Sequence, residues 1–446
     1  MNEEIEKVKE FLITEVDRQL NSLLEFNTNQ SSLLEFELTI QKNIKELGRI
    51  ILERMIPAVF GDGYEGTHVE ESEEETYSCV LRKNKRALKT IFGNIEIIRA
   101  YYQNDQDGSS LGLLDKKLEI HNYKISPALR YFAGLMGTVT TFREGADILK
   151  RINGITISSS EIDVLTEEKA KQAYEMHDKE IEYIQHRHDE KIDPAKIKVE
   201  KEPKRLIYLE CDGCFVPTMD DWKECKTLLL FEVGEKGMKK KRYYSTTNSA
   251  LYFKKQVRVK LEQYCGDDNV KIICIGDGAK WIWRMCKELI PNGRVDILDW
   301  YHVEERIGLL AAELFQDNET EKEEFRTEIK GYFYNGKSEE GIEKLHAIHD
   351  ETKDRELSEM IQKQITYFEN NKERMNYPKY IEEGYAIGSG AIESANKYVI
   401  QRRLKLPGIR WTSENANHMA HIRTEYINGE LDNLYGIKEN PLMAAT

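Results

Sequence analysis

The chain has 446 residues, of which 40% are hydrophobic and 32% charged, a composition typical of a globular protein with two to four domains. No apolar run approaches the roughly 18 residues that a membrane-spanning helix needs. The first residues lack the basic and apolar regions of a secretion signal. Seven cysteines without disulfide-framework spacing predict a reducing, cytoplasmic location.

The net charge of −14 is unevenly distributed along the chain. Residues 1–80 carry 18 acids and 7 bases, whereas residues 81–160 carry 7 acids and 13 bases. A polyanion responds to the local charge rather than to the total. The overall acidity therefore does not exclude a nucleic acid as a partner.

The N-terminal part combines helical patterns with a basic hairpin. Apolar residues recur at helical spacing over 3–26 and 33–56, which predicts two amphipathic helices that form a packed hairpin or a dimer contact. We expect a glycine-and-acid loop at 61–76, then a β-hairpin over 90–97 with its turn at Gly93-Asn94. A cluster of bases precedes this turn and suits either phosphate contacts or a solvated face: Arg82, Lys83, Lys85, Arg86 and Lys89.

Residues 126–185 predict three helices. Ser126-Pro127 begins the first, which runs to about residue 140, and the second covers 142–152. After a turn at Asn153-Gly154, the capping box Ser158-x-x-Glu161 opens a third helix that continues to about residue 185. This order is typical of a helix-turn-helix, although plain helical packing produces the same pattern.

From residue 205 the pattern predicts an α/β sheet. Three strands at about 206–213, 227–233 and 243–246 precede a helix, and strands at 270–276 and 294–299 flank another helix. A basic turn at 236–242 contains Lys239, Lys240, Lys241 and Arg242. Residues 303–377 are charged and helical without a strand pattern. A final helix covers 413–427, and the tail after Gly429 is expected to fray.

Three carboxylates are the candidate catalytic groups. Asp212 and Asp277 each close an apolar strand and precede a glycine, while Glu393 lies in the first turn of a helix that follows a glycine-serine turn. Such acids repel one another in a cleft unless a cation lies among them. Oxygen ligands favour Mg²⁺ or Mn²⁺, and two such ions support attack on a phosphodiester. Three rival acids lack the strand-end glycine: Asp220, Asp221 and Asp296.

A cationic stretch without acids follows Glu393. Its side chains suit a phosphate backbone, although an ordinary basic surface helix has the same composition. Trp411, like Trp281 and Trp283, could stack on an unpaired base, but core packing is the simpler interpretation of the latter two. The cations are Lys397, Arg402, Arg403, Lys405 and Arg410.

Several of these segments resemble bacterial insertion-sequence transposases of the Kra/Lre type, which are relatives of the Mutator-like transposases with a DDE catalytic triad. The most specific is Gly276-Asp277-Gly278-Ala279-Lys280-Trp281-Ile282-Trp283. The resemblance covers roughly residues 80–430. The other matching segments are 92–93, 142–146, 210–213, 298–302, 388–395, 402–405 and 408–411.

The resemblance implies an RNase H-like catalytic core with a mixed five-stranded sheet and a helical insertion, after a mainly helical N-terminal region with a helix-turn-helix. It implies that Asp212, Asp277 and Glu393 bind two Mg²⁺ or Mn²⁺ ions. Asp299-x-x-His302 matches the family's acid-x-x-His signature, in which His302 is either a structural hydrogen-bonding residue or a catalyst. By resemblance, a homodimer or larger oligomer cuts double-stranded DNA at transposon ends and joins the 3′-OH to a target.

On this interpretation the segments are a helical hairpin (1–60), an acidic loop with a basic hairpin (61–125), a helix-turn-helix with a long helix (126–190), the two parts of the core (204–302 and 385–430) and the insertion (303–380). Two alternatives stay open. One is a metal-dependent DNA nuclease on the same fold. The other is a domesticated DNA-binding protein without catalysis, which the intact Asp, Asp and Glu set does not favour.

Overall fold

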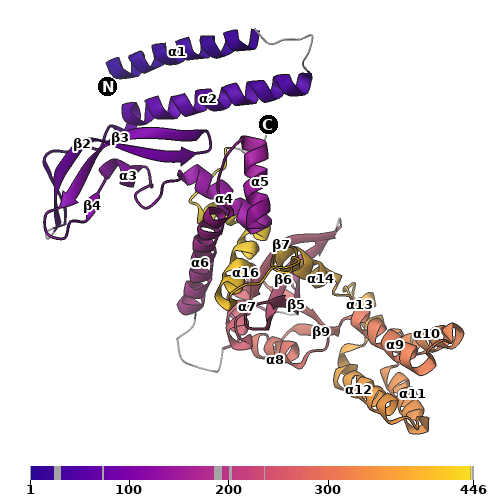
Figure 1. Ribbon diagram of the computed structural model, residues 1–446. Helices are drawn as coiled ribbons and strands as arrows, with labels where there is room; N and C mark the ends of the chain where they lie inside the picture. Colours follow the sequence, from indigo (N-terminus) through magenta and orange to yellow (C-terminus); the bar gives the residue numbers. More distant parts are fainter. Residues whose placement is uncertain are drawn as a thin grey trace. The chain divides into compact units, whose positions relative to one another are not determined.

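The computed structural model of the chain describes residues 2–24, 32–72, 75–184, 193–199, 203–235, 237–441 and 443 (Figure 1). The chain divides into two compact units, Met1–Thr166 and Glu167–Thr446, with the boundary inside helix α6 (Ser159–Ile184). Within these described residues, no helix is long and apolar enough to cross a lipid bilayer. All seven cysteines are free thiols.

The first unit begins with the two predicted helices. α2 starts at Ser32, where the Ser32 hydroxyl accepts from the Glu35 N–H and the Glu35 carboxylate accepts from the Ser32 N–H, a capping box that favours a helix start. Asn43 of α2 donates to Ser22 of α1 at 3.0 Å. The helices are α1 (Asn2–Leu24) and α2 (Leu33–Phe60).

A four-stranded antiparallel sheet follows, in the order β1-β2-β3-β4. The predicted hairpin is longer than 90–97, and its turn lies at Ile91-Phe92 rather than at Gly93-Asn94, because Thr90 pairs with Gly93. The Thr90 hydroxyl accepts from the Phe92 N–H and holds this turn. The loop expected at 61–76 contains strand β1. The strands are β1 (His68–Ser72), β2 (Glu75–Thr90), β3 (Gly93–Asn104) and β4 (Ser110–Leu111).

The helices predicted over 126–185 are present. Ser126 caps the first, Thr141 and Glu144 form a capping box on the second, and Gly154 ends the second with a φ of 57°. A Cβ on Gly137 would lie 2.0 Å from the Thr166 hydroxyl, so this glycine permits close packing of two helices. These helices are α4 (Pro127–Val139), α5 (Phe142–Asn153) and α6, and the short helix α3 (Leu113–Lys117) precedes them.

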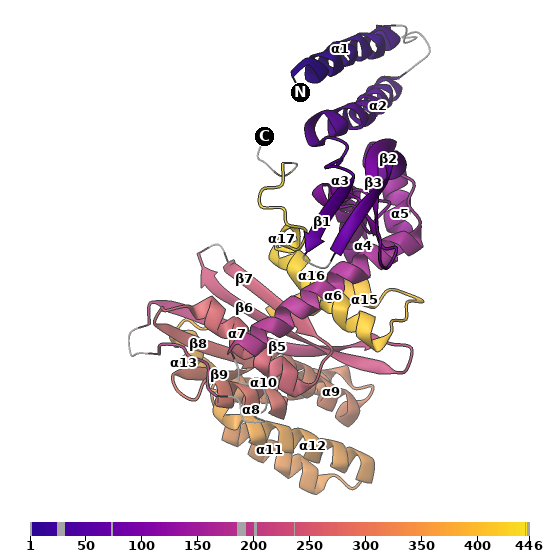
Figure 2. The same cartoon turned by 90° about the vertical axis from the view of Figure 1, so that its left-hand side faces the viewer.

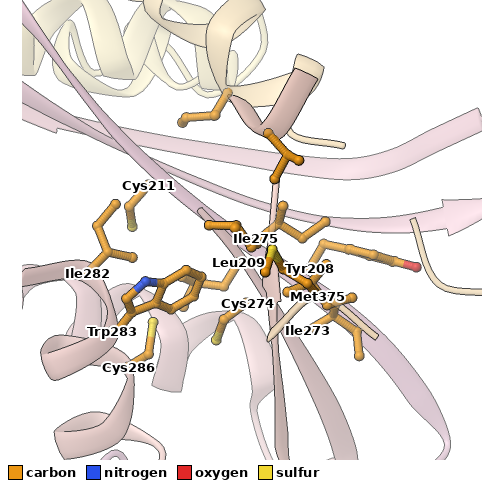
Figure 3. Packing of buried hydrophobic residues seen from close by; sticks show 14 of the residues in the cluster. Tyr208, Leu209, Cys211, Ile273, Cys274, Ile275, Ile282, Trp283, Cys286 and Met375 are labelled. Carbon is orange, nitrogen blue, oxygen red and sulfur yellow. The ribbon is translucent and has the colours of Figure 1, made fainter. Parts of the chain in front are cut away.

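The second unit is built on a five-stranded mixed sheet in the order β7-β6-β5-β8-β9. β7, β6 and β5 are antiparallel, whereas β5, β8 and β9 are parallel. The apolar run of β8 is buried on both faces, as expected for an inner parallel strand, and its Ile273, Cys274 and Ile275 pack with Trp283 and Cys286 of α8 (Figure 3). The elements are β5 (Arg205–Pro217), β6 (Trp222–Gly234), β7 (Gly237–Thr246), α7 (Ala250–Cys265), β8 (Val270–Gly276), α8 (Lys280–Leu289) and β9 (Arg294–Leu298).

The segment between β9 and α14 is helical, as the sequence predicts. Two of its larger helices, α11 and α12, lie side by side in both views (Figure 1, Figure 2). Ile329, Phe333, Ile365 and Phe368 of this segment are buried in the core cluster that also contains the sheet residues. The helices are α9 (Trp300–Phe315), α10 (Glu319–Tyr334), α11 (Ser338–Glu351), α12 (Arg355–Asn371), η1 (Lys372–Arg374) and α13 (Tyr377–Glu382).

The C-terminal part returns to the sheet through short elements. A π-helix directly after α14 is a feature that the sequence did not predict. The tail after Gly429 is not simply frayed, because residues 431–434 form a helix with buried Leu431 and Leu434. The elements are α14 (Gly390–Ala395), the π-helix η2 (Asn396–Gln401), α15 (Arg402–Leu404), α16 (Ser413–Asn428) and α17 (Leu431–Leu434).

Candidate active site

Asp212 and Asp277 lie at neighbouring parallel strands. Glu210 of β5 pairs with Ile275 of β8, the last pair between the two strands, and Asp212 and Asp277 follow two residues later on each side. Asp277 follows the end of β8, as predicted. Asp212 does not end its strand, because pairing with β6 continues to Pro217.

The glycines beside these two acids have different roles. Gly278 has a φ of 94°, and a Cβ there would lie 2.6 Å from the Tyr367 ring. The Tyr367 hydroxyl donates to the Asp277 carbonyl at 2.7 Å and holds this turn. At Gly213 a Cβ would lie 2.5 Å from the Glu224 carboxylate, so a larger residue there would displace the end of this partly exposed side chain.

The Asp212 carboxylate is held by two donors. Asn396 Nδ2 donates to Asp212 Oδ2 at 2.6 Å, and the Gly213 N–H donates to Oδ1 at 2.7 Å. Burial raises the pKa of the Asp212 carboxyl, and the charge of Asp277 raises it further, while His302 lowers it. Like charges therefore meet beside a histidine, an arrangement that favours a cation.

Glu393 lies on α14, whose first turn is held by Asp299. Asp299 Oδ1 accepts from the Ser389 N–H at 2.8 Å, and Oδ2 accepts from the Ser389 hydroxyl at 2.6 Å. Gly388 allows the close approach of Tyr301, because a Cβ there would lie 2.5 Å from that ring. The Glu393 side chain is exposed. The glycine-serine turn thus presents Glu393 at the carboxyl ends of the parallel strands.

Asp299 and His302 form the centre of this site. His302 Nδ1 lies 2.5 Å from Asp299 Oδ2. Ligand atoms of Asp299, His302 and Glu393 all lie within 4.8 Å of one another, a spacing that could hold a metal ion. The hydrogen bond to Asp299 raises the pKa of His302, burial opposes this, and Asp277 adds to the increase. Burial would raise the pKa of Asp299, but the hydrogen bonds from His302 and Ser389 make the net change a decrease.

Glu210 is a buried acid beside this centre that sequence reasoning missed. Its side chain is fully buried, and its Oε2 accepts from the Ile392 N–H at 2.9 Å. Burial raises the pKa of Glu210 to about 8, and the charges of Asp299 and Glu393 also raise it. The available signal was position, since Glu210 lies two residues before Asp212 and therefore on the same face of the strand. Ser389 and Asn396 were also missed as functional residues.

The cations after Glu393 separate into exposed and buried groups. Lys397, Arg402, Lys405 and Arg410 are exposed. Arg403 is fully buried and lies over the ring of Trp411, which is itself buried. The expected DNA contact is therefore revised for Arg403 and Trp411, because both side chains pack inside the protein.

The segment expected to be a basic turn at 236–242 is mostly strand β7; Lys236 lies outside the described residues. Lys239, Lys240, Lys241 and Arg242 are exposed. Lys239 and Lys240 pair with the buried Glu232, and Arg242 pairs with Glu430.

The bases of β2 also differ in exposure. Arg82, Lys83 and Lys85 are exposed, and Lys85 pairs with Glu96 at 2.7 Å. Arg86 instead forms an ion pair with the buried Asp115 and donates to the Tyr123 carbonyl at 2.6 Å. Its guanidinium supports the fold of the first unit, so the expected phosphate contact is revised for Arg86.

These features define a mixed α/β protein with an acid-and-histidine site at the carboxyl ends of parallel strands. The chain belongs to the family described as "Uncharacterised protein family (UPF0236)", whose model matches residues 26–438. Its relatives include UPF0236 proteins of Caldanaerobacter subterraneus subsp. tengcongensis. One is 26% identical over 417 residues, which cover 90% of this chain and 79% of the relative. Another is 27% identical over 415 residues, covering 89% and 74%. The first of these relatives has one protein name that combines eleven separate designations from that organism.

Proposed function

We propose that this protein is a DDE-type DNA transposase, which cuts phosphodiester bonds at the ends of a mobile element and joins the freed 3′-OH to target DNA. The observation that carries the proposal is that Asp212 of β5 and Asp277, which directly follows the adjacent parallel strand β8, both interact with His302, the histidine that is grouped with Glu393 of α14. Asp212 and Asp277 each interact electrostatically with His302, and a Glu393 oxygen lies within 4.8 Å of a ligand nitrogen of the same histidine.

The fold supports the same proposal. Three antiparallel strands followed by two parallel ones, in the order β7-β6-β5-β8-β9, match the strand order expected of an RNase H-like core. The helices α9 to α13 then correspond to an insertion before the strand-facing Glu393 helix. The succession of α4, α5 and the start of α6 is compatible with the expected helix-turn-helix.

The residues of the site fit a divalent cation. Burial raises the pKa of Asp212, and repulsion from Asp277 raises it further; a cation between the two carboxylates would relieve this repulsion. Asp212, Asp277 and Glu393 would supply oxygen ligands, the type that Mg²⁺ and Mn²⁺ prefer. The chemistry that two such ions supply when bound is activation of the attacking oxygen and stabilisation of the leaving oxygen of a phosphodiester.

The chain's own residues orient the ligands and hold the DNA. Asn396 and the Gly213 N–H fix the Asp212 carboxylate, and Tyr367 fixes the Asp277 turn. Exposed cations next to Glu393 would neutralise backbone phosphates, which supplies most of the sequence-independent affinity for DNA. These cations are Lys397, Arg402, Lys405 and Arg410.

The names of the relatives give independent support. One relative has a single name that joins eleven designations of one organism, and another joins four. A shared name of this kind is expected when a gene is present in many copies. A mobile element that encodes its own transposase would multiply in this way.

The test is cleavage and joining of DNA fragments that carry the sequences flanking the gene, with purified protein and Mn²⁺. We expect the wild-type protein to nick and join these fragments, and Glu393→Gln to abolish both reactions while DNA binding is retained. Glu356→Gln, which changes an exposed glutamate in the first turn of α12, is the matched control and should remain active.

Three results would contradict the proposal. Nicking without joining would favour a metal-dependent nuclease on the same fold. DNA binding without any cleavage by the wild-type protein would favour a DNA-binding protein without catalysis. Full activity of Glu393→Gln would remove Glu393 from the site.

A further inference from the structure

Asp299 has no free acceptor position for a metal ion, although it lies in the candidate cation cluster. Its Oδ1 accepts from the Ser389 N–H at 2.8 Å and from the Tyr301 N–H at 3.2 Å. Its Oδ2 accepts from His302 Nδ1 at 2.5 Å and from the Ser389 hydroxyl at 2.6 Å. With four donors on two oxygens, Asp299 orients its neighbours rather than binding a cation.

The bond to Asp299 fixes the orientation of the His302 ring. Because Nδ1–H donates to the carboxylate, the lone pair of the neutral ring is on Nε2. Among the described residues no hydrogen-bond partner of Nε2 is present. A metal-bound histidine usually binds the ion through one ring nitrogen, while its other ring nitrogen donates to a carboxylate outside the coordination shell.

We propose that His302 is a nitrogen ligand of the cation site, bound through Nε2 and oriented by Asp299, and that it makes the site favour Mn²⁺ over Mg²⁺. This inference rests on the proposed function, since it concerns the same site. Imidazole nitrogen strengthens the binding of transition ions, whereas Mg²⁺ prefers oxygen. The site would therefore hold one imidazole among the carboxylates of Asp212, Asp277 and Glu393.

Two observations support a ligand at this place. A His302 nitrogen and a Glu393 oxygen lie within 4.8 Å of each other, a spacing that a single cation could bridge. Glu210 is fully buried, interacts with Asp299 and Glu393, and its Oε1 has no hydrogen-bond partner. A buried carboxyl oxygen without a partner calls for an absent polar group, which a water molecule in an occupied cation site would supply.

The test is pulsed EPR of Mn²⁺ bound to the full chain without DNA, which detects nitrogen coupled to the ion. We expect a histidine-type nitrogen signal in the wild-type protein, and its loss in His302→Gln. Isothermal titration should show at least about a tenfold weaker affinity for Mn²⁺ in His302→Gln, since loss of even an outer-shell partner of a ligand has an effect of this size, and a smaller change for Mg²⁺. The control is His346→Gln, an exposed histidine of α11 that pairs with Glu369, which should retain the signal.

A second measurement needs no substitution, so it stands even if His302→Gln does not fold. Wild-type protein whose histidines carry the heavier nitrogen isotope should show the isotope change in the coupled signal. Bound Mn²⁺ without a histidine signal, or a signal that persists in folded His302→Gln, would overturn the inference and leave the transposase proposal intact. Absence of any Mn²⁺ binding would overturn both.

Discussion

Asn396 Nδ2 donates to Asp212 Oδ2 across 2.6 Å and joins the π-helix η2 to the central strand β5. The wide turn of η2 leaves carbonyls without a regular helical partner, and the buried Arg423 donates to those of Tyr398 and Val399. π-helices of this length often mark functional sites. Here the π-helix follows the Glu393 helix and brings Asn396 to the carboxylate.

We expect Asn396→Ala to weaken Mg²⁺ and Mn²⁺ binding by about tenfold to a hundredfold, the usual effect of removing a group that orients a metal ligand. Isothermal titration without DNA measures this directly. Asn335→Ala is the control, since Asn335 is exposed and bonds only within its own helix end. Equal affinities in wild type and Asn396→Ala would show that Asp212 needs no such support.

Gly278→Ala tests the turn that carries Asp277. The alanine would have to adopt a φ near 94° with its Cβ 2.6 Å from the Tyr367 ring, which we expect to lower the free energy of unfolding by about 1–3 kcal/mol. Urea denaturation gives this value. Gly331→Ala is the control, because no atom lies within 4 Å of its added Cβ inside helix α10, and it should stabilise by about 0.5–1 kcal/mol. If Gly331→Ala lowered the free energy of unfolding more than Gly278→Ala, the proposed role of Gly278 in the Asp277 turn would be wrong.

The burial of His421 leads to a prediction of how the free energy of unfolding depends on pH. Burial lowers the pKa of His421 well below its usual value, and the charges of His177, His418 and Lys260 lower it further. Glu425, an acid next to this cluster, pairs with His177 at 2.9 Å. The unfolded chain takes up a proton below a pH of about 6.5 that the folded state excludes.

The free energy of unfolding should therefore decrease as the pH falls below that value, by up to about 1.4 kcal/mol per pH unit from this residue. Urea denaturation from about pH 7 to pH 5 measures the slope, which His421→Gln should flatten. Parallel pH dependences of wild type and variant would rule out His421 as the cause.

Arg410 and Arg403 should differ although both belong to the same basic stretch. Arg410 is exposed, so Arg410→Ala should weaken DNA binding and reduce the salt slope of the affinity by about 1. Arg403 is buried against Trp411, so Arg403→Ala should instead reduce stability by about 1–3 kcal/mol and leave the salt slope unchanged. DNA titrations at several salt concentrations, together with thermal denaturation, distinguish these outcomes. A reduced slope in Arg403→Ala would contradict the buried role.

The local sequence pattern was sufficient to predict most of the helices and strands. The apolar run of β8, the capping residues of α4 to α6 and the helical texture of 303–377 act over a few residues, so the sequence alone predicts them. The same local signals correctly predicted that Asp277 follows a strand and that Glu393 lies in the first turn of a helix. They failed for the end of β5 and the turn at Ile91-Phe92, where strand pairing decides the boundary.

The chain alone therefore determined the order of helices and strands and the acids that stand beside glycines, since these depend on neighbours in sequence. Only the tertiary structure decided that Asp299 and Ser389 hold the Glu393 turn and that Asn396 reaches Asp212. It alone also decided that Arg403 packs against Trp411 and that Arg86 pairs with Asp115, so that both side chains make their contacts within the protein. Burial and hydrogen bonding between residues far apart in the chain have no local pattern, because they arise when separate elements pack together.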